Sequence, residues 1–293
     1  MKIKIIFTKQ ILLAAVITIC SQQNIFSQNR NGSPADKPGL FVGLSLGPSQ
    51  TQITNEGTFS GSNVLSNKMN TFFGSAEIGY FFSEYIGLSS GVSYSSYKTQ
   101  LTLATYQNNF NTIDSENETY ERRVSGTDIK EVQNIGFVSV PVCLNIRIPF
   151  SKTFGFCLQS GINLSVPISK KYTSSGTFTY KGYYPAYNTL LENLPAYGFP
   201  SNHSTVANGE LELKPFDVSA IASAGFDFFV QEKIQIAVAA CYNRSFSNIS
   251  AYTSPDTFRL SSDVDQINSL MGGSSKVTFQ SFGIKLSFRY FLK

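Results

Sequence analysis

Hydrophobic and polar residues alternate one by one along eight segments of the chain. The clearest is 138–148, where aliphatic residues stand at the even positions and mostly small or polar residues stand between them. Successive side chains of a β-strand point to opposite faces, so a period of two places all the aliphatic residues on one face. The same pattern predicts strands at 40–47, 71–82, 86–103, 154–166, 216–228, 234–243 and 281–290.

The connections between these segments alternate between short and long. Three are short polar turns, at 83–85, 151–153 and 231–233, and four are long, at 51–70, 104–133, 169–214 and 247–275. Short periplasmic turns and long extracellular loops are typical of outer-membrane barrels, whose tilted strands need about 9–11 residues to cross the bilayer. The chain is therefore predicted to be all-β: an eight-stranded antiparallel up-and-down transmembrane β-barrel with three short periplasmic turns and four long extracellular loops.

Composition narrows the class of protein further. Charged residues make up 14% of the chain, aromatic residues make up another 14%, and the mean hydropathy is −0.05. These values are too polar for a helical membrane protein and too poor in charge for a typical soluble one. A soluble periplasmic sandwich or lipocalin-like binder is the alternative, but it requires a polar outer face, whereas here the aliphatic face is the continuous one.

The N-terminus predicts export. Lys2, Lys4 and Lys9 precede the apolar run 11–19, as in a secretory signal peptide. A membrane anchor would need about 20 apolar residues, and acylation of Cys20 is a further alternative. We expect a signal peptide at 1–28, a short periplasmic segment at 29–38 and the barrel domain at 39–293.

Loss of the predicted signal peptide removes most of the basic character of the chain. Its three lysines account for the fall in formal net charge from +4 to +1. A nucleic-acid partner is therefore not expected.

Six charged residues fall on the face opposite the aliphatic one. Three acids and three bases should balance in the lumen of a barrel just wide enough for side chains, because unpaired buried charges are costly. We expect a polar network that plugs the barrel, with a proton or ion path or a small ligand cavity as alternatives. The network consists of Glu77, Arg147, Asp217, Asp227, Lys285 and Arg289.

The remaining candidates for chemistry are few. Without the predicted signal peptide the chain keeps three cysteines, Cys143, Cys157 and Cys241. Their odd number and the lack of CxxC spacing exclude a disulfide framework and a thiolate zinc site. A disulfide between Cys143 and Cys157 stays open. Acidic clusters at 114–123 and 261–265 are interpreted as solvated surface, with a calcium or ligand site as the alternative. We expect no metal and no cofactor.

Catalysis is not expected either. The chain has a single histidine, His203, in the loop 169–214, and it lacks GxSxG, HExxH and P-loop patterns. A lipid-modifying enzyme of the outer membrane would need such a group as general base. That function is kept as an alternative.

The loop 169–214 also offers a recognition surface. Its tyrosines are suited to contacts on a rigid scaffold, although 177–180 could instead prolong the preceding strand beyond the membrane. The candidate recognition residues are Tyr172, Tyr180, Tyr183, Tyr184, Tyr187 and Tyr197.

Three segments resemble the PorT-type outer-membrane β-barrel family. They are the strand Val138–Arg147 with its inward proline, Phe216-Asp217 opening a strand rich in glycine and alanine, and Tyr242–Ile249. The resemblance implies an eight-stranded barrel in the cell outer membrane and, for one branch of the family, a link to protein secretion.

Together these observations predict a structural or interaction role. The expected partners are outer-membrane lipid, the barrel-assembly machinery during biogenesis and an unidentified protein. A small pore or transport protein is the first alternative, and a lipid-modifying enzyme is the second.

Overall fold

The structure is a computed structural model that describes residues 39–56, 58–59, 62–231, 233–252 and 257–292. The predicted signal peptide and the segment 29–38 lie outside the described residues.

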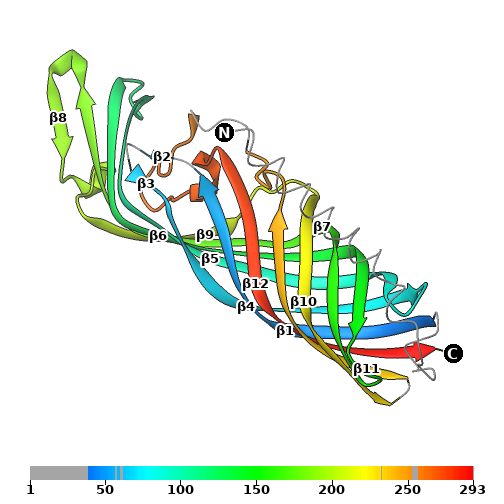
Figure 1. Cartoon of the computed structure of the whole chain (residues 1–293). Helices are drawn as coiled ribbons and strands as arrows, with labels where there is room; N and C mark the ends of the chain where they lie inside the picture. Colours follow the sequence, from blue (N-terminus) through cyan, green and yellow to red (C-terminus); the bar gives the residue numbers. More distant parts are fainter. Residues whose placement is uncertain (1–38, 57, 60–61, 232, 253–256, 293) are drawn as a thin grey trace, which may run out of the picture.

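Eight antiparallel strands close into a ring, as predicted (Figure 1). Each strand pairs with the next, and the last pairs back with the first, so the barrel has no open edge in its membrane-spanning part. The ring consists of β1 (Gly39–Glu56), β4 (Leu65–Phe81), β5 (Ile86–Ile113), β6 (Thr119–Pro149), β7 (Phe154–Tyr184), β10 (Asp217–Gln231), β11 (Ile234–Ser245) and β12 (Lys276–Leu292).

Short strands and 3-10 helices lie at the end of the ring that carries the long loops. These are the hairpin of β2 (Thr58–Phe59) and β3 (Ser62–Asn63), the strands β8 (Thr189–Glu192) and β9 (His203–Glu210) beside β7, and the 3-10 helices η3 (Pro185–Tyr187), η4 (Pro195–Tyr197) and η6 (Leu270–Gly273). No helix in the described ranges is long and apolar enough to cross a membrane.

The alternation places apolar side chains outside and polar ones inside, the reverse of a soluble barrel. Leu44 and Leu46 of β1 are 62% and 61% exposed, while the intervening Ser45 is buried and donates a hydrogen bond to Ser287 Oγ (2.9 Å). Lipid surrounds the apolar face in a membrane, so this exposure is favourable. The strand pattern is therefore confirmed.

The predicted long loop 104–133 is wrong. β5 runs to Ile113 and β6 starts at Thr119, so a single hairpin with a short turn replaces the loop. The prediction failed because the apolar and polar faces exchange places above the membrane: Leu101 and Leu103 point inward and are fully buried, while polar residues face water. The segment 177–180 belongs to β7, so the extended form of that strand is confirmed.

This exchange gives the barrel a water-facing upper part with its own apolar core. β5, β6 and β7 rise beyond the other strands toward the end that carries β8 (Figure 1). Two clusters fill the space between them and the connection from β11 to β12, which contributes Leu260, Ile267, Leu270 and Met271. That connection closes the extracellular end of the lumen.

Four phenylalanines lie together at the opposite, periplasmic end. The ring of Phe291 lies 5.6 Å from those of Phe41 and Phe229 and 6.1 Å from that of Phe81, measured between centroids. A Cβ at Gly79 would lie 2.3 Å from Cζ of Phe41, so the glycine is what allows this ring to turn inward. We call these four rings the aromatic plug.

Candidate functional site

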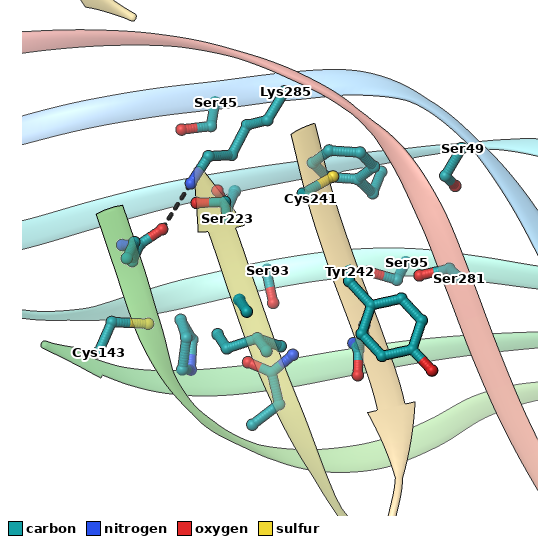
Figure 2. Close-up of a pocket in the computed structure, with 18 of the residues that line it drawn as sticks. Ser45, Ser49, Ser93, Ser95, Cys143, Ser223, Cys241, Tyr242, Ser281 and Lys285 are labelled. Atoms are coloured by element: carbon teal, nitrogen blue, oxygen red, sulfur yellow. Dashed lines mark hydrogen bonds between the residues drawn. The ribbon is translucent and has the colours of Figure 1, made fainter. Parts of the chain in front are cut away.

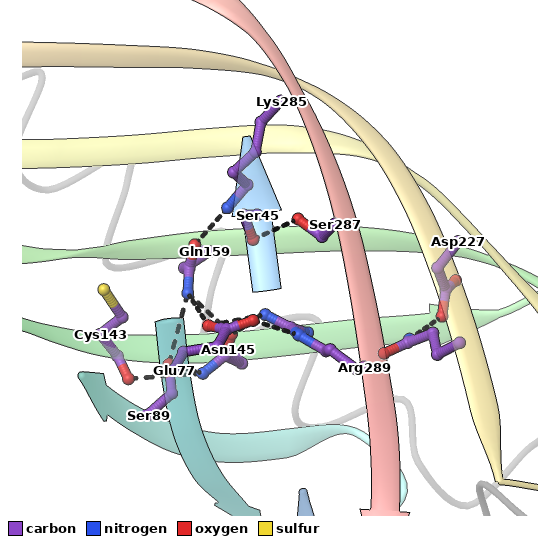
Figure 3. A network of polar contacts seen from close by, with 11 residues as sticks. Ser45, Glu77, Ser89, Cys143, Asn145, Gln159, Asp227, Lys285, Ser287 and Arg289 are labelled. Atoms are coloured by element: carbon purple, nitrogen blue, oxygen red, sulfur yellow. Dashed lines mark hydrogen bonds and ion pairs between the residues drawn. The ribbon is translucent and has the colours of Figure 1, made fainter. Parts of the chain in front are cut away.

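The structure turns all six predicted charged residues toward the lumen and pairs four of them. Glu77 of β4 accepts a hydrogen bond from Arg289 Nε of β12 (2.7 Å), and Asp227 of β10 accepts one from Arg147 Nε of β6 (2.6 Å). All four side chains are buried, and each ion pair joins strands that are not neighbours in the sequence. Figure 3 shows the pair of Glu77 and Arg289.

Neutral side chains connect the first pair to its neighbours. Arg289 Nη2 donates to Asn145 Oδ1 (3.0 Å), Asn145 Nδ2 donates to Ser89 Oγ (2.8 Å), and Gln159 Nε2 donates to Asn145 Oδ1 (3.2 Å). Gln159 also accepts from Lys285 Nζ (2.5 Å). The network therefore crosses the lumen from wall to wall (Figure 3).

The ion pairs also contact the aromatic plug. The guanidinium carbon of Arg147 lies 4.8 Å from the ring centroid of Phe229, and that of Arg289 lies 4.8 Å from the centroid of Phe41. Gln235 donates a second hydrogen bond to Asp227. Cation–π contacts of this kind are strengthened where water is excluded. They hold the plug and the polar network together.

Asp217 is separate from the network. One of its carboxylate oxygens accepts hydrogen bonds from Ser245 Oγ (2.7 Å) and Ser247 Oγ (3.1 Å), and the other has no partner among the described residues. No described cation forms an ion pair with it.

A cavity of about 110 Å³ lies in the middle of the lumen (Figure 2). Serine hydroxyls form most of its polar wall, with Lys285 at one side. The lining includes Ser45, Ser49, Ser75, Ser89, Ser93, Ser223, Cys143 and Cys241.

The three described cysteines are free. In the register of β6 and β7, Cys143 faces Gly161 and Cys157 faces Arg147. The two thiols are thus out of step across the strand pair, and the alternative of a disulfide between them is not realised.

A second hollow, of about 680 Å³, lies outside the barrel between two tips. One tip is the turn from β5 to β6, and the other is the connection from β7 through η3 and β8 to η4. We call it the tip groove. Its walls include Asp114, Glu116, Glu118, Tyr120, Tyr184, Tyr187, Tyr197 and Phe199.

Tyrosines and carboxylates of the two tips are hydrogen-bonded across the tip groove. The hydroxyl of Tyr184 donates to Asp114 Oδ2 (3.1 Å), and that of Tyr187 donates to Glu118 Oε1 (2.6 Å). The backbone N–H of Glu118 and that of Glu116 donate to Asp114, which lowers the pKa of that carboxyl. Burial, together with the hydrogen bond to Asp114, raises the pKa of Tyr184 to about 12.

The other predicted recognition tyrosines occupy different positions. Tyr180 is fully buried and donates to Asp263 O (3.1 Å), so it cannot present a surface and the expectation does not hold for it. Tyr172 is partly buried and donates to Ile267 O (3.3 Å), whereas Tyr183 lies beside the guanidinium of Arg123 (4.7 Å). Of the six predicted recognition tyrosines, Tyr184, Tyr187 and Tyr197 line the tip groove.

Arg122 is a residue whose role sequence reasoning missed. It is buried, donates to Asp263 Oδ1 and to Gly198 O (3.2 Å each), and packs over Tyr180. It fastens three extracellular segments together. It shares the inward face of β6 with apolar residues such as Val124, two positions along, and this spacing could have revealed it.

Glu131 is the second missed residue. This fully buried carboxylate accepts hydrogen bonds from Ser174 Oγ (2.6 Å), Gln133 Nε2 (2.7 Å), Ser269 Oγ (2.7 Å) and Leu270 N (2.8 Å). Burial raises the pKa of its carboxyl. It ties the connection between β11 and β12 to the barrel wall.

The acidic side chains of the segment 261–265 contact other parts of the protein and are not simply solvated. Asp263 pairs with Arg122, and Asp265 Oδ1 lies 2.7 Å from His203 Nε2 in an exposed contact. Among the described residues no group of three His, Cys, Asp or Glu side chains is placed to hold a metal ion.

Comparison with solved structures finds small outer-membrane barrels. OprG from Pseudomonas aeruginosa is similar at 12% identity and a TM-score of 0.42, covering 89% of this chain and 99% of that one. Neisserial surface protein A is similar at 10% identity and a TM-score of 0.37, covering 88% and 100%. At these identities the likeness concerns the fold alone.

Comparison of sequences assigns the family. A search of curated proteins finds no significant match. Residues 26–251 match the family model described as outer membrane protein beta-barrel domain, which is more than half of the chain. The protein therefore belongs to the outer membrane protein beta-barrel domain family and resides in the cell outer membrane.

Proposed function

We propose that the protein is an interaction protein whose barrel anchors a rigid extracellular platform, and that the tip groove of this platform binds a partner. The observation that carries the proposal is the tip groove itself, with Tyr187 62% and Tyr197 75% exposed in water, far from lipid. Exposed aromatic groups around a concave surface are typical of binding sites.

The chemistry of the tip groove favours a partner with cationic or donor groups. Three carboxylates, of Asp114, Glu116 and Glu118, lie among its aromatic walls. Tyrosine rings supply contact area at low entropic cost, and the carboxylates accept hydrogen bonds from a ligand.

The closed lumen argues against the alternative of a pore. The aromatic plug lies at the periplasmic end, the two apolar clusters lie at the extracellular end, and the ion pairs cross the space between them. In planar bilayers we expect no steady open state from the purified protein, and a steady conductance would favour transport.

A photo-crosslinking amino acid placed at Tyr197 tests the proposal in cells. We expect a discrete adduct on gels, which is lost when Tyr187→Ala and Glu118→Gln are added. The matched control position is Val206 of β9, which is 68% exposed but lies outside the tip groove. No adduct at Tyr197, or the same adduct from Val206, would contradict the proposal.

We also propose that the chain is not an enzyme. The imidazole Nε2 of His203 lies 2.7 Å from Asp265 Oδ1 in an exposed contact at the end of β9, without the buried surroundings that orient a catalytic base. We expect lipid A profiles to be identical in strains that make wild-type protein and His203→Ala. A profile that changes with the substitution would favour a lipid-modifying activity.

Membership in the PorT branch is the finer proposal on family. It is supported by the inward Pro141 and Arg147 of β6, which line the lumen as the resemblance implies. A deletion strain with altered secreted proteins would support the link to secretion, and an unchanged set would argue against it.

A further inference from the structure

One cation of the lumen has no carboxylate to neutralise it. Lys285 Nζ donates to the neutral Gln159, and no ion pair of the described residues includes it. Glu77 is already bound to Arg289, and Asp227 to Arg147. The group of Glu77, Arg289 and Lys285 therefore carries one excess positive charge inside the membrane-spanning part of the barrel.

Asp217 cannot supply the missing charge. Lys285 lies opposite Ala239 of β11, whereas Asp217 precedes Ser219, which lies opposite Ser245 of the same strand. Ala239 and Ser245 are six residues apart, which is about 20 Å along a strand at 3.4 Å per residue. A lysine side chain does not span that distance.

Lys285 points into the central cavity, whose wall supplies further donors (Figure 2). An ammonium has three N–H donors, and one is used by Gln159. The hydroxyls of Ser75 and Ser223 line the same cavity and can donate hydrogen bonds to an anion there. Donors around an unneutralised cation form a site complementary to an anion.

Size and access limit the class of anion. A water molecule needs roughly 10–15 Å³ of such a cavity, so 110 Å³ holds a small ion with a few waters. A volume of about 110 Å³ is too small for organic phosphates and other large anions.

We propose that this cavity is a binding site for a single small monovalent inorganic anion of chloride size, held by Lys285 and the serine wall. The anion cancels the excess charge of the lumen and so removes the penalty of an isolated ammonium in the membrane interior. The site is distinct from the tip groove and does not depend on it.

Bromide is the probe for the test. Protein refolded and crystallised in sodium bromide should give an anomalous difference peak within about 3.5 Å of Lys285 Nζ. The peak should vanish in Lys285→Met and persist in the matched control Lys181→Met, whose ammonium pairs with Glu192 at the surface. No peak in wild type, or a peak that persists in Lys285→Met, would overturn the proposal.

A measurement in solution covers the case in which Lys285→Met does not fold. Wild-type protein in detergent should have a higher Tm in sodium chloride than in sodium gluconate at equal ionic strength, because gluconate is too large for the cavity. Ser223→Ala, which keeps the lysine, should reduce the difference. Equal Tm values for wild type in the two salts would contradict anion binding.

Discussion

At the scale of single residues, the distance of a position from the lipid decides what its side chain does. Leu44 and Leu101 are the same residue type on strands of the same ring, yet one is exposed to lipid and the other is fully buried. Polar residues of the upper part follow no single rule. Glu131 is buried beneath the connection between β11 and β12, and Asp114 is held at a tip by backbone N–H groups.

Burial of the Tyr184 phenol, together with its hydrogen bond to Asp114, predicts a high phenol pKa. Since the pKa in the folded protein, about 12, exceeds the ordinary value of 10.0, the hydrogen bond stabilises the tips fully below pH 10. That contribution is lost as pH rises from 10 to about 12. The difference in absorbance at 295 nm between wild type and Tyr184→Phe should titrate near pH 12. A midpoint near 10 would show that the phenol is neither buried nor hydrogen-bonded to Asp114 as described.

Removal of the Glu131 carboxylate should loosen the extracellular closure. Glu131→Ala leaves the hydroxyls of Ser174 and Ser269 and the N–H of Leu270 without their acceptor, and we expect a loss of about 3 kcal/mol in unfolding free energy. Urea unfolding in detergent gives this value, and limited proteolysis should cut 247–275 faster. Glu131→Gln, which keeps one acceptor oxygen, is the control and should lose less. Wild-type behaviour of Glu131→Ala would refute the role.

At the scale of elements, the lumen network determines how strands distant in sequence are held. The pair of Glu77 and Arg289 joins β4 to β12 across β1, and the pair of Arg147 and Asp227 joins β6 to β10 across β7. Each pair therefore ties two strands that do not hydrogen-bond to each other. The backbone ladders alone do not provide this tie.

The ion pair between β4 and β12 predicts that the effects of substituting Glu77 and Arg289 on stability are strongly coupled. Glu77→Ala leaves the Arg289 guanidinium buried without its partner, and we expect a loss of about 3–5 kcal/mol. The double variant Glu77→Ala with Arg289→Met should be more stable than Glu77→Ala alone, because the guanidinium that lost its partner is then absent. Denaturant unfolding of the four proteins of this cycle measures the coupling, and additive losses would exclude it.

At the scale of the whole molecule, one continuous sheet is surrounded by lipid in its membrane-spanning part and by water in its upper part. The membrane-spanning part exposes its apolar face, while β5, β6 and β7 continue into water and bury theirs. Water then drives the upper part to fold as a soluble core would, which gives the tip groove a rigid support. β8, whose Thr189 and Leu191 line the tip groove, lies at the opposite end of the molecule from the end of β12 (Figure 1).

This arrangement predicts the sidedness of the chain. In a background with Cys143, Cys157 and Cys241 replaced by serine, a membrane-impermeant maleimide should label Asn188→Cys in intact cells. The control Ser151→Cys, in the turn between β6 and β7, should be labelled only after permeabilisation. The reverse pattern of labelling would invert the barrel in the membrane.

The sequence by itself determined the membrane-spanning barrel. Strict alternation, as in Val138–Ile148, defined the strands, and the same alternation turned Glu77, Arg147, Asp217, Asp227, Lys285 and Arg289 inward. These features depend on local periodicity, which is fixed by backbone geometry and can be counted along the chain.

Only the tertiary structure decided which residues meet. The partner of Arg289 is Glu77, not Asp217, because strand register sets their heights in the lumen. Similarly, the extension of β5 and β6, the burial of Tyr180 and Glu131 and the pairing of the two tips depend on contacts over long sequence separations. Periodicity specifies the face of a side chain, but register and the surrounding solvent specify its neighbours.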